Sequence, residues 1–325
     1  MKKYWSVLII LGLITSCAED DDGLGLVQVP PRLLSEVALE DEEEIRAFLQ
    51  THFYNYEEFE APPADFDFKI RIDTITGVNS EKTPLSQQVD SLIINVSSEQ
   101  FNLGDDEEDV PHKLYFVNVR GGEGQSPTVA DSTLIKYEGS LLDGTRFDAV
   151  SDFFWQELPF FIQGFAHGAA ALRTGTTDGL VINPDGTSRF TNSGIGLLFI
   201  PSGLAYFNSP PSSTIEAYDP LIFSIELGLF VEDTDNDDDG IPSILEDLNE
   251  DLNLFNDNTD NNAENEQGLL FRLPNFRDAD DDGDGVLTRT EISDADGNII
   301  IPYPDSNNDG TPDYLDADVQ RDPND

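Results

Sequence analysis

YEGSLLDGTRFD, residues 137–148, is the stretch that decides the fold. Its first half belongs to an alternating pattern over residues 135–142 that predicts a β-strand, and Asp143-Gly144 is typical of a turn. Further elements are predicted downstream, namely a short helix with Phe165, Ala169 and Leu172 on its buried side and strands at residues 196–200 and 221–230. Many strands with one helix indicate an α+β domain with a mainly antiparallel sheet.

Four segments, in this order, resemble FKBP-type peptidyl-prolyl isomerases. Residues 137–148 are similar to the family's Tyr-x-Gly-x-Leu-x-Asp-Gly-x-x-Phe-Asp, and FIQGFAHG (161–168) to its Val-Ile-x-Gly-Trp-x-x-Gly. IPSGLAY (200–206) resembles Ile-Pro-x-x-Leu-Ala-Tyr, and LIFSIEL (221–227) resembles the final strand. The resemblance covers residues 113–230, about a third of the 325 residues.

The resemblance implies a half-wrapped antiparallel sheet around one short helix, with a pocket between them. Ile215 would lie on a loop over this pocket, and Phe154 or Trp155 would supply a further wall. The residues expected to form the catalytic site are Tyr137, Phe147, Asp148, Phe161, Ile162, Phe165, Tyr206 and Phe223.

Such a pocket would isomerise X-Pro bonds with no nucleophile, proton shuttle or cofactor. Rotation about a peptide bond costs about 18–20 kcal/mol because it breaks amide resonance, and X-Pro isomers exchange over roughly tens to hundreds of seconds. The twisted amide is less dipolar than the planar one, so a dry aromatic cleft disfavours it less than water does. By the resemblance, Phe165 lies beneath the proline ring, Tyr206 and the Ile162 amide donate to substrate carbonyls, and Asp148 acts electrostatically.

Three departures from the family pattern leave alternatives open. Phe165 replaces a Trp, residues 149–159 form a shorter segment than usual, and about 15 extra residues within 176–193 predict a surface hairpin. A non-catalytic peptide-binding module, or a calcium-dependent surface structural component with an incidental isomerase fold, are the alternative functions. The histidines 52, 112 and 167 lie in no zinc-protease or triad-like motif, which favours structural roles.

The charge of the chain excludes one class of partner. There are 65 acidic and 17 basic residues, a formal net charge of −48, whereas phosphate binding needs Lys and Arg to release counterions. We therefore expect no nucleic acid partner and no general adsorption to anionic membranes. Residues 231–325 hold 29 of the acidic and four of the basic residues, so the excess is concentrated at the C-terminal end.

Three C-terminal loops repeat a calcium-loop pattern. Calcium takes six to eight hard oxygen ligands, which alternate acidic residues supply, and a glycine at position 6 permits the sharp turn. The third loop resembles thrombospondin type-3-like repeats, and Asp278, Asp280, Asp282 and Gly283 fit a shifted version of the second. Residues 249–267, rich in Asn and Asp, predict little order. The predicted calcium ligands are Asp235, Asp237, Asp239 and Glu246 in the first loop, Asp280, Asp282, Asp284 and Glu291 in the second, and Asp305, Asn307, Asp309 and Asp316 in the third.

The first residues predict export and lipidation. Lys2 and Lys3 precede a short apolar run that ends in Ile-Thr-Ser-Cys at Cys17, which resembles a bacterial lipobox; the run is far shorter than the roughly 20 residues of a membrane span. An ordinary cleaved signal is the alternative. We expect a lipid on Cys17 as the protein's only contact with the membrane, in the cell envelope at the outer membrane. The acidic residues after Cys17 resemble a surface-display signal, with a solvated tether as the alternative.

The region before the isomerase-like segment carries no recognisable chemistry. Residues 41–56 predict a helix with Asp41 as its N-cap, and residues 66–75 and 92–96 predict strands. Proline-containing polypeptides are the expected clients, and the oligomeric state is open. The expected organisation is a signal peptide (1–16), a tether (17–34), a region of unknown role (35–112), an FKBP-type domain (113–230) and an acidic calcium-binding region (231–325).

Overall fold

The structure is a computed structural model that describes residues 31–104, 107–268 and 272–322. Residues 1–16, Cys17 and most of the predicted tether therefore lie outside the described residues. The described residues from Arg32 onward form one compact unit. No helix among the described residues is long and apolar enough to cross a membrane.

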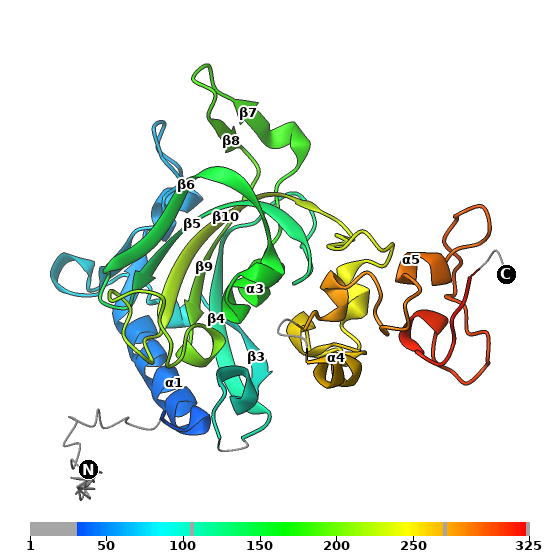
Figure 1. Cartoon of the computed structure of the whole chain (residues 1–325). Coiled ribbons are helices and arrows are strands. Elements are labelled where there is room, and N and C mark those ends of the chain that lie inside the picture. The colour runs from blue at the N-terminus through cyan, green and yellow to red at the C-terminus, as the bar shows by residue number, and fades with distance from the viewer. Residues whose placement is uncertain (1–30, 105–106, 269–271, 323–325) are drawn as a thin grey trace, which may run out of the picture. The chain divides into compact units, whose positions relative to one another are not determined.

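The central element is a six-stranded sheet in which all neighbouring strands are antiparallel, as predicted (Figure 1). Two small two-stranded sheets lie outside it, and one of them is the surface hairpin predicted within residues 176–193. In spatial order, the strands of the large sheet are β3 (Asp90–Val96), β4 (Val110–Arg120), β9 (Gly194–Ile200), β10 (Leu221–Val231), β5 (Ser132–Leu141) and β6 (Arg146–Glu157). The small sheets pair β1 (His52–Tyr54) with β2 (Ile72–Thr74) and β7 (Leu180–Ile182) with β8 (Ser188–Phe190).

The helices are short except for the first. The α-helices are α1 (Leu34–Thr51), α2 (Tyr56–Glu60), α3 (Gln163–Ala170), α4 (Asn261–Gln267) and α5 (Thr288–Glu291). The 3₁₀ helices are η1 (Gly77–Asn79), η2 (Leu85–Gln87), η3 (Ser98–Phe101), η4 (Leu158–Phe160), η5 (Thr177–Gly179), η6 (Ser202–Leu204), η7 (Ser243–Glu246), η8 (Leu254–Asn256), η9 (Asn275–Arg277) and η10 (Asp313–Leu315).

The stretch 137–148 forms most of the β5–β6 hairpin. Gly144 sits in the turn with φ +85°, a left-handed conformation that favours glycine, and the Thr145 amide donates to Asp143 Oδ1 at 2.7 Å. Gly139 is required for a different reason. A Cβ placed there would lie 2.6 Å from the Phe147 ring, so the ring packs directly on the glycine backbone.

Both faces of the sheet are covered, which explains the role of the region before residue 113. Every residue of β9 is buried, and successive side chains point to opposite faces. Leu198 and Ile200 join the core on the α3 side, whereas Leu197 and Phe199 join a second cluster with Ile45, Phe48 and Leu49 of α1. The sheet also starts at β3, so it extends beyond the predicted boundary at residue 113.

The prediction that Asp41 caps a helix is wrong. The helix begins at Leu34, because Leu34 and Val37 extend its buried stripe by two turns, and Asp41 lies inside it. The Asp41 side chain is buried, and its Oδ2 accepts hydrogen bonds from the Ser202 amide and the Ser202 hydroxyl, both at 2.7 Å. Burial raises the pKa of Asp41 to about 7, against the lowering effect of these hydrogen bonds.

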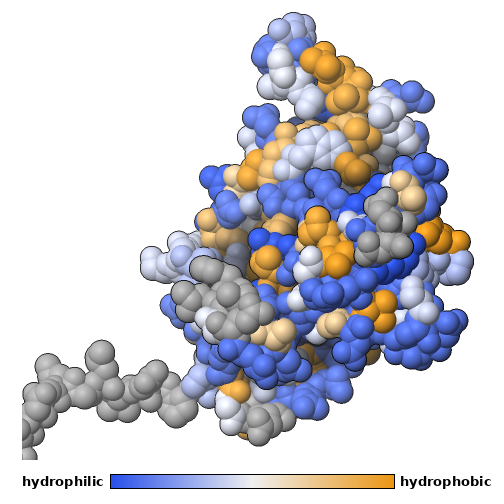
Figure 2. All heavy atoms as spheres, turned by 45° about the vertical axis from the view of Figure 1, so that its right-hand side comes forward, coloured by the Kyte–Doolittle hydropathy of each residue, from blue (hydrophilic) through white to orange (hydrophobic). Residues whose placement is uncertain are grey.

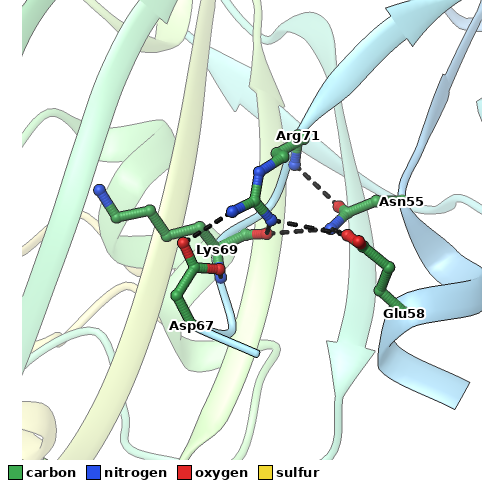
Figure 3. A network of polar contacts seen from close by, with 5 residues as sticks. All are labelled: Asn55, Glu58, Asp67, Lys69 and Arg71. Carbon is green, nitrogen blue, oxygen red and sulfur yellow. Dashed lines mark hydrogen bonds and ion pairs between the residues drawn. The ribbon is translucent and has the colours of Figure 1, made fainter. Parts of the chain in front are cut away.

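The predicted strand at residues 66–75 is mostly irregular, since only Ile72–Thr74 pairs as a strand. The residues before Ile72 are held by polar side-chain contacts rather than by strand pairing (Figure 3). Arg71 forms an ion pair with Asp67 at 2.7 Å, and Asn55 accepts from the Arg71 amide and donates to the Lys69 carbonyl. Phe66 and Phe68 pack their rings on Phe59 of α2, so their alternation reflects an aromatic cluster.

The acidic region is more ordered than predicted. Residues 249–267, for which we expected little order, form η8 and α4. Leu254 and Phe276 belong to the main core, which ties this region to the sheet domain. On the face that Figure 2 shows, hydrophilic residues predominate and hydrophobic ones form small groups, the largest near the top of the view.

Candidate functional site

An aromatic cluster fills the space between α3 and the sheet. Phe165 of α3 lies 5.6 Å from the Tyr137 ring of β5 and 5.1 Å from the Phe223 ring of β10, both edge-on. The Phe147 ring packs edge-on against Phe223 at 5.5 Å. The structure thus brings together the aromatic residues that the sequence predicts for the pocket, in favoured ring geometries.

Within the cluster, the Phe161 ring covers Phe165, the residue predicted to lie beneath the proline ring. Phe165 is fully buried, and the Phe161 ring is stacked on it with centroids 4.2 Å apart. Phe161 stands where the family pattern has Val, and Phe165 where it has Trp, so a larger outer residue covers a smaller inner one. Phe161 is partly exposed, whereas Phe165 is not. That Phe165 lies beneath a bound proline ring stays a prediction.

A polar rim borders the aromatic cluster. The Tyr137 hydroxyl donates to Asp148 Oδ2 at 2.7 Å, and Asp148 is exposed to solvent. Burial and this hydrogen bond raise the pKa of Tyr137. Burial, and then the charge of Asp148, raise the pKa of Tyr206, which places both tyrosines in the field of one carboxylate. Both hydroxyls therefore keep their protons at neutral pH and are available as hydrogen-bond donors, a role that the Tyr137 hydroxyl fills toward Asp148.

Two donors at the rim remain unused. Among the hydrogen bonds of the described residues, none involves the Tyr206 hydroxyl, and none is donated by the Ile162 amide. Ile162 precedes the first residue of α3, where amides have no partner within the helix. Both groups can therefore donate to carbonyl oxygens of a bound peptide.

Asp41 anchors the segment that carries Tyr206, a contact that the sequence did not reveal. Ser202, the residue that Asp41 binds, begins η6, and Tyr206 follows this helix by two residues. The partners are 161 residues apart in the chain, so no local pattern links them. The feature that reveals the contact between Asp41 and Ser202 is the burial of the Asp41 carboxyl, which is visible only in the folded structure.

The other residues singled out from the sequence lie in different environments. Phe154 lies 6.1 Å from the Tyr137 ring and contributes to the wall, whereas Trp155 is largely exposed. Ile215 is buried in the main core. His112 is also buried, with Nδ1 against the Val110 carbonyl, and burial lowers its pKa.

The C-terminal loops form carboxylate clusters. Oxygens of Asp235, Asp237 and Asp239 lie within 4.8 Å of one another, as do those of Asp280, Asp282 and Asp284. In each loop, the position-6 glycine amide donates to the position-1 carboxylate, Gly240 to Asp235 at 2.9 Å and Gly285 to Asp280 at 3.1 Å. The predicted register is therefore present in both loops, while Asp278, which fits the shifted register, joins Asp260 and Glu264.

The position-12 residues behave differently in the three loops. Glu291 is buried with Oε2 unpartnered, and burial together with the charge of Asp282 raises its pKa to about 8. In the third loop, the Gly310 amide binds Asp305, and the Asn307 amide group reaches Asp309 and Asp316 at 3.1 and 2.8 Å. Among the described residues, this third loop holds no buried unpartnered oxygen.

Glu246 closes the first loop together with a residue that we did not predict. Oxygens of Asp239, Glu246 and Asp281 lie within 4.8 Å of one another, and each side chain is 1% exposed. Asp239 Oδ2 and both oxygens of Glu246 and Asp281 have no hydrogen-bond partner. Burial, and then neighbouring carboxylates, raise the pKa of Glu246 to about 10 and that of Asp281 to about 9.

Known proteins are similar to separate parts of this chain. A family model described as BamM C-terminal matches residues 236–304. A peptidyl-prolyl cis-trans isomerase from Pseudomonas syringae pv. tomato is 19% identical with a TM-score of 0.32, over 62% of this chain and 98% of its own. FkpA from Escherichia coli is 25% identical with a TM-score of 0.29, and a multi-domain immunophilin from Arabidopsis thaliana is 15% identical with a TM-score of 0.30.

The last two matches each cover 37% of this chain and less than half of the other protein, 48% of FkpA and 43% of the immunophilin. The antiparallel sheet around a short helix is compatible with an FKBP-like fold. Because the TM-scores lie well below 0.5, we base the function on the residues of the site.

Proposed function

We propose that the domain around α3 is a peptidyl-prolyl cis–trans isomerase that acts on exported, proline-containing polypeptides. The observation that carries this proposal is the rim of unused donors around an aromatic surface. The Ile162 amide and the Tyr206 hydroxyl are unpaired among the described hydrogen bonds, and Asp148 is held at the same rim by Tyr137. These are the groups that isomerisation needs, because the reaction breaks no covalent bond.

Some residues of the site hold the peptide in place, and Asp148 acts on it through its charge. Phe161 supplies the apolar surface for the proline ring, and the two donors fix the flanking carbonyls. The amide loses resonance and becomes less dipolar as it twists, so an apolar surface disfavours the twisted form less than water does. Asp148 lies at the exposed edge, where its negative charge acts on the dipole of the rotating carbonyl group.

The test is the cis–trans exchange rate of an X-Pro peptide, measured by NMR exchange spectroscopy with the whole exported chain. Removal of one hydrogen bond in Tyr206→Phe is expected to lower the catalysed rate about 2- to 10-fold. Asp148→Asn is expected to lower it further, whereas Asp152→Asn changes the same charge at an exposed position of β6 and is expected to have no effect. An exchange rate unaffected by high concentrations of the wild-type protein would refute catalysis.

A peptide-binding module without catalysis is the second candidate, and the burial of Phe165 favours it. A floor covered by Phe161 is shallower than one open to the inner aromatic residue. In that case, the peptide binds with the same dependence on Tyr206, but the exchange rate does not change.

We further propose that the C-terminal loops bind calcium. Buried carboxylates without partners are strongly destabilising unless a cation or a proton neutralises them. Asp239, Glu246 and Asp281 provide five such oxygens, and hard oxygen ligands suit calcium. When bound, the ion would supply charge neutralisation and a structural centre for the two loops. Chelation is expected to increase proteolysis of residues 232–322; equal protease resistance with and without chelator would refute the proposal.

The cellular location is proposed from the sequence pattern around Cys17. We propose that Cys17 carries a lipid that anchors the protein at the outer membrane in the cell envelope. Fractionation and mass spectrometry of the mature N-terminal peptide test this, with Cys17→Ser as the comparison. An unmodified Cys17 in the wild-type protein would contradict the anchor.

A further inference from the structure

A fourth loop with the pattern of the predicted calcium loops lies between residues 247 and 257. The Leu252 amide donates to Asp247 Oδ2 at 2.9 Å, as the position-6 glycine amides do in the predicted loops. The Asp251 amide donates to Asn249 Oδ1 at 2.8 Å, and the Asn253 amide donates to Asp251 Oδ1 at 2.8 Å. The sequence pattern misses this loop because leucine occupies position 6, where it adopts a left-handed φ of +64°, and because its last acidic residue, Asp257, stands at position 11 while position 12 is Asn258.

The side chains of this loop converge on one point. Carboxylate oxygens of Asp247, Asp251 and Asp257 lie within 4.8 Å of one another. Asp257 is 6% exposed, and its Oδ2 atom has no hydrogen-bond partner. A buried carboxylate oxygen that faces two further carboxylates needs a positive charge, and in the part of the chain that the structure describes no Lys or Arg forms a salt bridge with these three residues.

This loop also contacts the isomerase-like domain. Leu254 is buried in the main core, and the Phe255 ring lies 6.3 Å from Phe160 of η4 and 5.1 Å from Phe276. Phe160 directly precedes Phe161, the outer residue of the aromatic cluster. The loop therefore lies at the junction between the acidic region and the segment that leads into α3.

We propose that Asp247, Asp251 and Asp257 form a fourth divalent cation site, which takes calcium and fixes η4 and α3 from the outside. Cation binding draws the three carboxylates together and so restrains Leu254 and Phe255 between them. Restraint of Phe255 is passed to Phe160 through their ring contact, and to the chain at Phe161. The cation site does not depend on the isomerase activity, whereas an effect of calcium on that activity rests on the function proposed above.

The test compares Asp257→Asn with Glu250→Gln, which removes the same charge from an exposed residue of the same loop. Native mass spectrometry of the whole exported chain in calcium is expected to show one bound ion fewer for Asp257→Asn and the wild-type number for Glu250→Gln. Asp251→Asn, at an exposed ligand, is expected to lose the same ion and serves if the buried variant does not fold.

Hydrogen exchange distinguishes a cation site from a purely structural cluster. Calcium is expected to slow amide exchange over residues 158–170 in the wild type and in Glu250→Gln, and not in Asp257→Asn. An unchanged ion count in both Asp257→Asn and Asp251→Asn would overturn the site. An ion lost without any change in exchange over residues 158–170 would overturn the connection to α3, and a peptide-exchange assay that fails in all variants would concern the isomerase proposal alone.

Discussion

Replacement of Asp41 by Asn is expected to remove one defined contribution to the pH dependence of stability. Asp41 is 2% exposed, and burial raises its pKa from 3.8 to about 7. The folded state thus binds the proton more tightly than the unfolded chain does. Stability from this group is therefore fully present below pH 4 and is lost as the pH rises to 7.

The size of the effect follows from the two pKa values. A carboxyl group with a pKa of about 7 in the folded state and 3.8 in the unfolded chain favours folding by about 2.7 kcal/mol at pH 5 and about 0.1 kcal/mol at pH 8. Asn does not titrate, but its carbonyl oxygen can still accept from the Ser202 amide. The wild type should therefore lose about 2–3 kcal/mol more than Asp41→Asn between these pH values.

Urea unfolding in the same calcium-containing buffer at pH 5 and pH 8 measures this difference. The acidic clusters of the C-terminal region also titrate, but they are common to both proteins and cancel in the comparison. Glu43→Gln, at an exposed position of α1, is the matched control and should follow the wild type. Parallel losses for the wild type and Asp41→Asn would refute the reasoning that Asp41 is a buried, titrating anchor.

Three further substitutions test other parts of the structure. Phe161→Val removes the apolar surface proposed for the proline ring and should lower the unfolding free energy by about 1–3 kcal/mol while weakening the binding of a proline peptide in NMR titration; tighter binding would show instead that Phe161 blocks access to Phe165. Gly139→Ala forces the Phe147 ring to move and should cost about 1–3 kcal/mol in urea unfolding, whereas Gly104→Ala, in open space, should cost little; equal costs contradict the packing argument. Asp281→Asn should lower the melting temperature in excess calcium, because it removes a ligand, and change it much less in chelator at pH 7, where a pKa of about 9 keeps the Asp281 carboxyl neutral. An equal shift in both buffers speaks against a cation between Asp239, Glu246 and Asp281.

The sequence predicted the elements whose signals are local. The strands predicted at residues 135–142, 196–200 and 221–230 correspond to β5, which ends one residue earlier at Leu141, and to β9 and β10, and the insertion after α3 forms the β7–β8 hairpin. These segments follow the alternating pattern and turn residues that strands need, so a short window of sequence suffices. The aromatic residues predicted for the pocket came from the resemblance to a family, which short motifs carry, and the structure places them together in one cluster.

What the sequence did not reveal depends on contacts that no pattern of residue types displays, whether the partners are near or far apart in the chain. Asp41 has the sequence context of a helix cap, and only the contact with Ser202 gives it another role. Phe161 and Phe165 both differ from the family pattern, and only the structure shows that the larger outer ring stacks on the smaller inner one. The loop at residues 247–257 lacks the position-6 glycine of the three predicted calcium loops, and Leu252 adopts the left-handed φ in its place.

The acidic region shows why these long-range contacts matter for function. Away from the main core, its buried apolar cluster consists of Ile241, Ile292 and Tyr314. The same region buries Asp239, Glu246 and Asp281 within a few ångströms of one another. An apolar cluster of this size stabilises by only a few times the ~1.5–3 kcal/mol of a single buried side chain, which is too little to offset unneutralised carboxylates. If cations supply the difference, as proposed, calcium concentration sets the order of the acidic region and, through Leu254 and Phe255, the rigidity of the segment that leads into the aromatic cluster at α3.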